Sequence, residues 1–153
     1  MKKLLLLSLL SILAANASAA SNCSISYTTD VKLDEIIKKN NFEFENYDEV
    51  CNRLKNSNAK VDLRYSSAID KQQTTAVIIA QVIDKNFPIL SNSYKRSMWS
   101  SQERTTAIER ELLMGAVNEA LNAIDQSDIQ GLNESRKKMG FKAYPTSSNV
   151  NKK

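Results

Sequence analysis

The chain has 153 residues, no histidine, three glycines, and 21 Lys and Arg side chains against 17 Asp and Glu, a formal net charge of +4. Without histidine the chain has no Ser-His-Asp triad, Cys-His pair or histidine-containing zinc site. The glycines, at positions 115, 131 and 140, are too far apart for a phosphate-binding loop. The sequence therefore predicts neither a metal nor a cofactor.

The N-terminus has the three parts of a secretory signal peptide. Met1–Lys3 is positively charged, Leu4–Leu13 is apolar apart from two serines, and Ala17–Ala19 has the small residues that signal peptidase accepts. The apolar run has about ten residues, against the ~20 that a membrane-spanning helix needs. We therefore expect cleavage after Ala19, removal of residues 1–19, and a bacterial protein that is periplasmic or secreted and has no transmembrane anchor.

The basic excess lies near the C-terminus. Removal of residues 1–19 takes away Lys2 and Lys3 and leaves 19 basic and 17 acidic side chains. Residues 132–153 hold six basic side chains against Glu134, so the rest of the exported chain is slightly acidic. Neither the charge nor export gives a reason to expect a nucleic-acid partner. Four basic residues are candidates for a surface that meets anionic lipid, lipopolysaccharide or an acidic partner, with a solvated helix face as the alternative: Arg136, Lys137, Lys138 and Lys142.

The two cysteines, Cys23 and Cys51, are predicted to form a disulfide, because an even number of cysteines in an oxidising compartment favours pairing. In the chain-entropy account such a bond stabilises the fold by roughly 3–4 kcal/mol. Lipidation of Cys23 is the weaker alternative, because Asn22 precedes it where a lipoprotein has a small residue. A reactive thiol is weaker still, since no histidine is present to activate it.

Two short helices are predicted before residue 58. Asp30 is positioned to cap a helix over residues 31–39, which Asn40-Asn41 would end. Asn46 and Glu49 have the spacing of a capping box for the second helix. The apolar side of that helix consists of Tyr47, Val50, Cys51 and Leu54. A disulfide from this side would hold the N-terminal segment against the helix.

Residues 61–69 alternate between apolar and polar side chains, which predicts a strand with one solvated face. A polar turn at residues 70–73 leads to residues 74–83, which are rich in β-branched side chains and apolar on both faces. We interpret the pair as a β-hairpin, with a helix over 74–83 as the alternative. Because the second strand has two apolar faces, one of them needs a cover: further helices, an added strand near Ile25 and Tyr27, or a second copy of the chain.

Residues 84–101 are predicted to form a loop that contains Pro88 and the single tryptophan, Trp99. From Lys85 to Gln102 the segment has no acidic residue. Aromatic and arginine side chains are common at the energetic centres of protein interfaces, and loops often carry binding residues. Packing of Trp99 beneath the following helix is the alternative. The candidate binding residues are Tyr94, Lys95, Arg96, Met98 and Trp99.

A capping box at Ser100–Glu103 predicts the start of the longest helix, which continues to about Asp125. Gly115, in the middle of this helix, costs about 1 kcal/mol relative to Ala and indicates close packing. A last short helix is expected over residues 128–138, followed by a polar, disordered tail over residues 143–153.

Together these elements predict a small single α+β domain over residues 20–142, in which an antiparallel β-hairpin packs with several helices, including a long C-terminal helix. The function that fits best is that of a non-enzymatic envelope protein. Such a protein would bind another envelope protein or envelope component, as inhibitors, immunity proteins and assembly factors do.

Two other functions remain open. A self-associating structural protein, and hence a homo-oligomer, would explain the two apolar faces of residues 74–83. A small periplasmic hydrolase would use Ser135 with Lys138, or a pair of carboxylates. The candidate carboxylates are Asp48, Glu49, Asp62, Asp84, Glu109 and Glu111.

Overall fold

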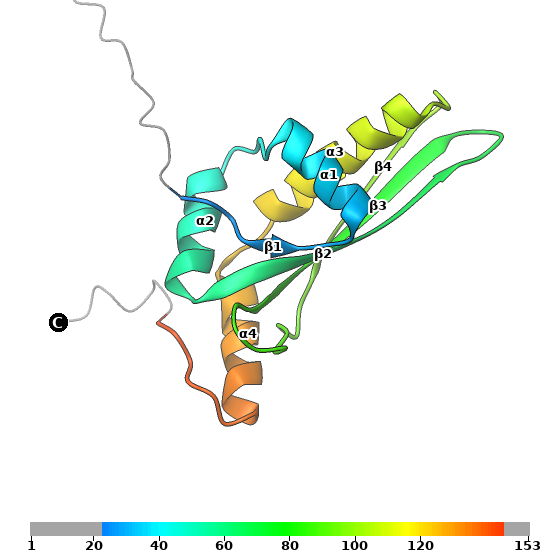
Figure 1. The fold of residues 1–153 in the computed structure, drawn as a ribbon. Coiled ribbons are helices and arrows are strands. Elements are labelled where there is room, and N and C mark those ends of the chain that lie inside the picture. Colours follow the sequence, from blue (N-terminus) through cyan, green and yellow to red (C-terminus); the bar gives the residue numbers. More distant parts are fainter. Residues whose placement is uncertain (1–22, 146–153) are drawn as a thin grey trace, which may run out of the picture.

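The computed structural model describes residues 23–145 and shows a four-stranded sheet packed with helices (Figure 1). The predicted signal peptide, residues 1–19, and residues 146–153 of the predicted tail lie outside the described residues. The strand order is β1-β2-β3-β4, with β1 parallel to β2 and the other pairs antiparallel. This is a small single domain of the expected α+β class. The elements are β1 Tyr27–Thr28, α1 Val31–Asn40, α2 Tyr47–Asn56, β2 Ala59–Ile69, β3 Thr74–Asp84, β4 Lys95–Ser101, α3 Thr106–Asn122 and α4 Gln126–Lys138.

The N-terminal segment is held to the domain at two points. Cys23 and Cys51 form the predicted disulfide, with their Cα atoms 6.0 Å apart. Further along, β1 pairs with β2, with Tyr27 opposite Val61. The Tyr27 ring also packs edge-on against Phe42, with 5.3 Å between the ring centroids. The added strand expected near Tyr27 is therefore present, but it lengthens the sheet at one edge and covers neither face.

The start and end of α1 follow the prediction. The Asp30 carboxylate accepts hydrogen bonds from the backbone N–H groups of Lys32 and Leu33, which satisfies two donors that the first turn leaves without a partner. The helix ends at Asn40, and Asn41 follows with a φ of 59°. Asparagine tolerates this left-handed conformation better than most residues, so the pair of asparagines ends the helix.

The expected capping box of α2 does not form. Asn46 has φ −95° and ψ 26°, which is outside the extended geometry of a capping residue, and its side chain makes no cap hydrogen bond. Glu49 forms an ion pair with Arg53, one turn further along, instead of reaching back. The side-chain oxygen of Asn122 accepts the Asn46 N–H at 3.1 Å. Helix α3, rather than a local cap, therefore fixes the start of α2.

β2 and β3 form the predicted hairpin and stay paired to its end, where Ile69 lies opposite Thr74. In the turn, the Asp70 carboxylate accepts hydrogen bonds from the N–H groups of Gln72 and Gln73. An Asp side chain that bonds the backbone in this way produces a tight turn without glycine. The helical alternative for the second strand is wrong, because β3 is extended along its whole length.

The segment before α3 is not a loop throughout. Lys95–Ser101 forms β4, which pairs antiparallel with β3 and lies at the edge of the sheet. Because β4 has polar side chains on both faces, its sequence lacks the alternation of apolar and polar residues that would predict a strand. The expected capping box at Ser100–Glu103 is also wrong, since its first two residues belong to β4. Thr105 caps α3 instead, and its side chain accepts a hydrogen bond from the Ile108 N–H.

The longest helix, α3, is shorter than expected at both ends and stops at Asn122. Asp125 does not end this helix but caps the next one, α4. Its carboxylate accepts the Ser127 N–H, while the Asp128 carboxylate accepts the Asp125 N–H, which completes a capping box. The last helix therefore begins earlier than expected, and a sharp change of direction separates α3 from α4 (Figure 1).

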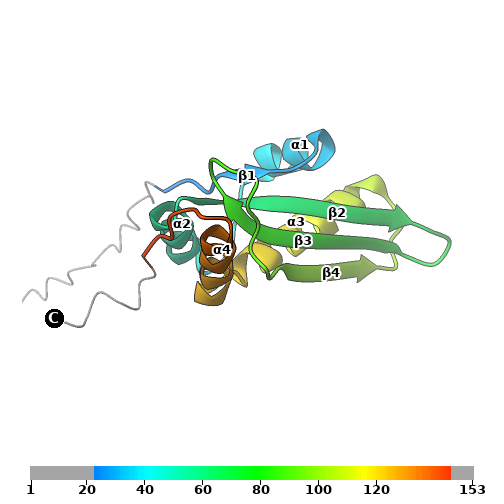
Figure 2. The same ribbon diagram turned by 90° about the horizontal axis from the view of Figure 1, so that it is seen from below.

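Helix α3 covers one face of the sheet, and the strands lie in front of it when the other face is viewed (Figure 2). Four residues of β3 are buried on the covered side: Ala76, Ile78, Ala80 and Val82. On the opposite side of the same strand, Ile79 is 36% exposed, and Val77 and Ile83 are half-buried. Helices therefore cover only one of the two apolar faces of β3. We call the other face the open sheet face.

Candidate binding site on strand β4

β4 directs its side chains alternately to the two faces of the sheet. On the α3 side, Ser97 and Trp99 both donate hydrogen bonds to Glu119. The residues that alternate with them lie on the open sheet face. The five candidate binding residues are therefore divided: Lys95 and Trp99 face α3, Arg96 and Met98 lie on the open sheet face, and exposed Tyr94 precedes the strand. They do not form one continuous surface.

Trp99 is fixed in place by α3. Its indole N–H and the Ser97 hydroxyl donate to the same Glu119 carboxylate. The hydrogen bonds from Ser97 and Trp99 lower the pKa of Glu119, because they stabilise its charged form. The indole packs on Gly115, where an added Cβ would lie 2.7 Å from Cζ3 of Trp99. This is the close packing that a glycine in mid-helix indicated, yet Trp99 is still 41% exposed.

The exposed part of Trp99 lines a groove between α1 and α3, which we call the Trp99 groove. The part beside the indole has a volume of about 450 Å³, and an adjoining part along α1 has a volume of about 260 Å³. The two parts share Lys39, Asn40 and Arg110. Met114 adds a second apolar side chain to the part beside Trp99. The groove therefore combines an apolar wall with a polar rim.

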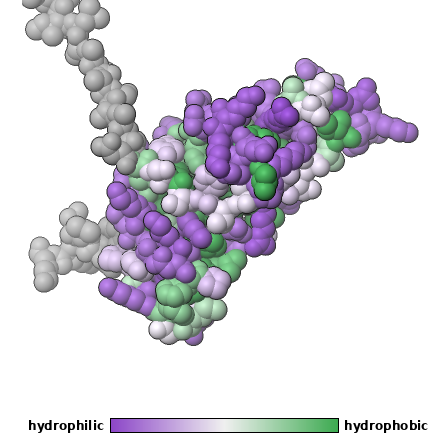
Figure 3. Space-filling view, viewed as in Figure 1, coloured by the Kyte–Doolittle hydropathy of each residue, from purple (hydrophilic) through white to green (hydrophobic). Residues whose placement is uncertain are grey.

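Most charged side chains around the Trp99 groove make no ion pair in the described structure; the exception is Lys32, which is paired with Glu109. Lys39 and Arg110 line the groove, as do Glu35 and Glu111, and none of the four makes an ion pair with a described residue. On the side drawn in Figure 3, which includes α1, hydrophobic spots are separated by hydrophilic side chains. Isolated charges of both signs around an apolar centre select a partner by its charge pattern as well as by its shape.

The open sheet face is a second candidate surface. It exposes Met98 at 61% and Ile79 at 36%, with Arg64 and Arg96 beside them. β4 pairs only with β3 in the described sheet, so one row of its backbone N–H and C=O groups is open to another strand. Two of the candidate binding residues, Arg96 and Met98, belong to this surface.

Lys95 holds the fold together rather than offering a free charge. Its ammonium group is 3.1 Å from carboxylate oxygens of both Asp125 and Asp128. The Ser93 hydroxyl also donates to Asp128, at 2.8 Å. Burial lowers the pKa of Lys95, but the hydrogen bonds to Asp128 and Asp125 outweigh burial and leave the pKa raised. These contacts fasten β4 to the start of α4, and they occupy the ammonium group that a ligand would need.

Arg136 does not belong to the predicted basic surface, because it is fully buried. Its guanidinium donates to Asp84 at 2.7 Å, to the Asn133 side-chain oxygen at 3.0 Å and to the Asn58 carbonyl at 3.0 Å. The Tyr144 ring lies 4.6 Å from the guanidinium carbon. Burial raises the pKa of Asp84, but hydrogen bonds from the backbone and from Arg136 prevail and lower it. We call these five residues the Arg136 cluster; it joins α4 to the base of the hairpin.

The other three residues of the predicted basic surface differ from Arg136. Lys137, Lys138 and Lys142 are exposed, so a basic surface without Arg136 stays a prediction. Ser135 is half-buried on α4, and no hydrogen bond joins it to Lys138 in the described structure. Tyr144, at the start of the predicted tail, is hydrogen-bonded through its backbone to Asn133.

Three of the carboxylates considered for hydrolysis, Asp62, Asp84 and Glu109, are engaged in separate contacts. Glu109 is bonded to Lys32 and Ser67, and Asp62 to Arg64, on separate parts of the fold. Asp84 belongs to the Arg136 cluster. In the described part of the chain, no group of three Asp, Glu or Cys side chains is placed to hold a metal ion. These contacts give the hydrolase hypothesis no support.

Comparisons with models of protein families, with curated proteins and with solved structures found no match to this chain. The Cys23–Cys51 disulfide fits an oxidising compartment outside the cytoplasm. Over residues 23–145, no helix has the length and apolar character needed to cross a membrane.

Proposed function

We propose that the protein is an exported, non-enzymatic binding module that recognises another protein of the cell envelope through the Trp99 groove and the adjoining edge of β4. The position of Trp99 carries this proposal. Glu119 holds its N–H and Gly115 accepts its ring, while 41% of the side chain stays exposed. An aromatic side chain that is already rigid loses little conformational entropy when a partner binds.

The surroundings of Trp99 favour a protein partner over a small molecule. Separate charges of both signs lie around the apolar wall, as the polar rim of a protein interface surrounds its buried centre. The free edge of β4 runs beside the groove and can accept an extended segment as an additional strand. A segment that pairs with β4 would bring alternate side chains next to Trp99.

A photoreactive amino acid at Ala107 tests the proposal, because Ala107 is exposed and lines the Trp99 groove. In intact cell envelopes we expect one discrete cross-linked product from this position, and we expect Trp99→Leu to abolish it. The matched control has the same photoreactive residue at Ala68, which is exposed on the open sheet face, and should give no such product. No product from position 107, or the same product from folded Trp99→Leu protein, would exclude the groove as the binding site.

One observation favours self-association as a second candidate function. Met98 and Ile79 are exposed beside the free edge of β4, and an exposed edge strand can pair with a second copy of the chain. Sedimentation equilibrium of the parent protein should then show a dimer that Met98→Lys weakens. A monomer at the highest concentration that stays in solution would exclude this candidate.

A further inference from the structure

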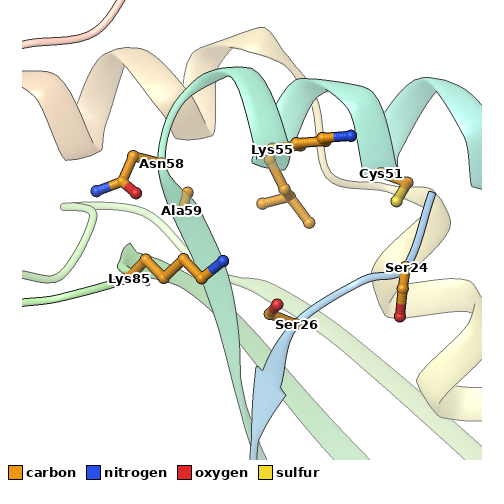
Figure 4. Close-up of a pocket in the computed structure, with 8 residues that line it drawn as sticks. Ser24, Ser26, Cys51, Lys55, Asn58, Ala59 and Lys85 are labelled. Carbon is orange, nitrogen blue, oxygen red and sulfur yellow. The ribbon is translucent and has the colours of Figure 1, made fainter.

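A cavity lies where the N-terminal segment crosses the end of α2, and it shares no lining residue with the Trp99 groove (Figure 4). Its volume is about 180 Å³. Four parts of the chain build it: the segment after Cys23, the last turn of α2, the start of β2 and the residue that follows β3. The polar lining consists of Ser24, Ser26, Lys55, Asn58 and Lys85, and the floor includes Leu54.

The lining is rich in hydrogen-bond donors and contains no carboxylate. Lys55 and Lys85 form no ion pair with any described residue. The hydroxyls of Ser24 and Ser26 and the side-chain amide of Asn58 make no hydrogen bond within residues that the structure describes. In Figure 4 the Lys85 amine extends toward Ser26, whereas Lys55 lies along α2. The cavity is thus lined by two lysines and three neutral donors that have no acceptor among the described residues, and its two lysines and two serines are exposed to solvent.

The protein's own donors engage several of the carbonyl groups at the negative end of α2. A helix C-terminus normally disfavours an anion, because its last carbonyl groups have no partner. Here the N–H groups of Ser57 and Asn58 bond the carbonyl groups of Arg53, Leu54 and Lys55, which precede the last residue of α2. The Asn58 carbonyl accepts hydrogen bonds from the Lys85 N–H and from Arg136. Because these acceptors are already engaged, the two lysines dominate the charge at the cavity.

We propose that this cavity binds a small oxyanion, namely a phosphate, sulfate or carboxylate group held between Lys55 and Lys85 and hydrogen-bonded by Ser24 and Ser26. Lysine serves widely as a phosphate ligand because its ammonium group is a compact charge. The volume lies below the ~300 Å³ at which pockets for drug-sized ligands begin. The occupant is therefore a small free anion or the charged group of a larger molecule. This site uses none of the residues of the proposed protein-binding groove.

The disulfide builds one wall of the anion site. The Cys23–Cys51 bond fixes the residue next to Ser24 to α2, and the Ser26 carbonyl accepts the Val61 N–H at 3.0 Å. Reduction of the disulfide frees Ser24 and leaves the two lysines in place. The affinity for the anion should therefore fall on reduction without vanishing, and full binding should require an oxidising compartment.

An NMR titration of the disulfide-bonded protein with inorganic phosphate tests this proposal. We expect saturable shifts of the backbone amide signals of Ser26 and Asn58. Lys55→Gln and Lys85→Gln should each weaken phosphate binding about tenfold, because each removes a hydrogen bond between charged groups. The matched control is Lys71→Gln, which changes an exposed lysine in the hairpin turn and should bind phosphate as the parent does.

A second titration identifies the source of the anion, with vesicles of phosphatidylcholine that contain or lack phosphatidylglycerol. Binding that requires phosphatidylglycerol and is lost in both lysine variants supports a lipid headgroup. Saturable binding of inorganic phosphate alone, with the same loss, supports a soluble anion. The proposal is overturned if neither probe gives saturable shifts, or if both lysine variants respond as the parent does. Thermal unfolding and mass spectrometry would verify that each variant is folded with its disulfide intact.

Discussion

The Arg136 cluster and the Trp99 groove use charged side chains in opposite ways. In the cluster the guanidinium is fully buried, and its Nε, Nη1 and Nη2 atoms all donate to protein oxygens. At the groove, Lys39 and Arg110 lie at the rim and form no ion pair with a described residue. The Trp99 side chain beside them is held in place by its hydrogen bond to Glu119 on α3. A charge whose partners are all supplied by the fold stabilises the fold. A charge left unpaired beside a rigid apolar side chain is available to a ligand.

The largest expected effect comes from breaking the Arg136 cluster. Arg136→Met leaves the Asp84 carboxylate buried without its cation, so we expect a loss of about 3–5 kcal/mol in the free energy of unfolding. Urea denaturation measures this loss. Lys137→Met changes the adjacent exposed residue and should alter stability by less than about 0.5 kcal/mol. Equal stabilities of the two variants would show that the cluster does not hold α4 to the hairpin.

A smaller effect, confined to the groove, is expected from Gly115→Ala. The new Cβ would contact the Trp99 indole at 2.7 Å. Crowding of this kind costs about 1–3 kcal/mol, and the better helix propensity of alanine returns about 1 kcal/mol. The expected net loss is therefore between about 0 and 2 kcal/mol. Because Trp99 is the only tryptophan, its fluorescence should shift to the red as the displaced ring becomes more exposed.

Gly131→Ala is the control for this displacement. Gly131 lies on α4, and its added Cβ would collide with the Asn92 side-chain oxygen, so this variant is also destabilised. It should nevertheless leave the Trp99 emission of the folded protein unchanged. If Gly115→Ala keeps the parental emission spectrum, the indole is not held against α3 in the manner described, and the proposal that a rigid Trp99 forms the binding site loses its basis.

The parts of the fold that neighbouring residues determine could be predicted from the sequence. The Asp30 cap, the hairpin with its polar turn, and the disulfide to the apolar side of α2 all depend on short patterns or on a count of two cysteines. β4 could not be predicted in this way, because polar side chains on both of its faces hide the alternation and its partner strand supplies most of the apolar surface. Edge strands of this composition resemble loops in sequence.

The candidate sites were only partly predictable, for a different reason. Arg136 has the sequence context of a surface charge, but its partners Asp84 and Asn58 lie 52 and 78 residues away along the chain. Packing of Trp99 beneath the following helix was one of two alternatives, and close packing at Gly115 was expected, but the sequence does not show that these two residues contact one another. The contact follows from the register of β4 on β3, which only the assembled sheet defines.

The smallest expected effect concerns the pH dependence of the groove. The hydrogen bonds from Ser97 and Trp99 lower the folded-state pKa of Glu119 below its usual value near 4.5. A lowered folded pKa means that the stabilisation is present above the unfolded pKa and is lost as the pH falls through the folded pKa. Since Glu119 is exposed, solvent screening limits this contribution to less than about 1 kcal/mol.

Trp99 fluorescence separates this titration from that of the other carboxylates. Protonation of Glu119 weakens its bond to the indole N–H. Because its pKa is lowered, the emission of the folded protein should stay constant through the ordinary glutamate range and change only at more acidic pH. Glu119→Gln should abolish the change, because its amide does not titrate. Glu111→Gln, on the same helix but without a bond to Trp99, should retain it. If Trp99 emission in Glu119→Gln depends on pH as it does in the parent protein, the transition belongs to another carboxylate. The hydrogen bond to Glu119 would then not be what holds Trp99 in the groove.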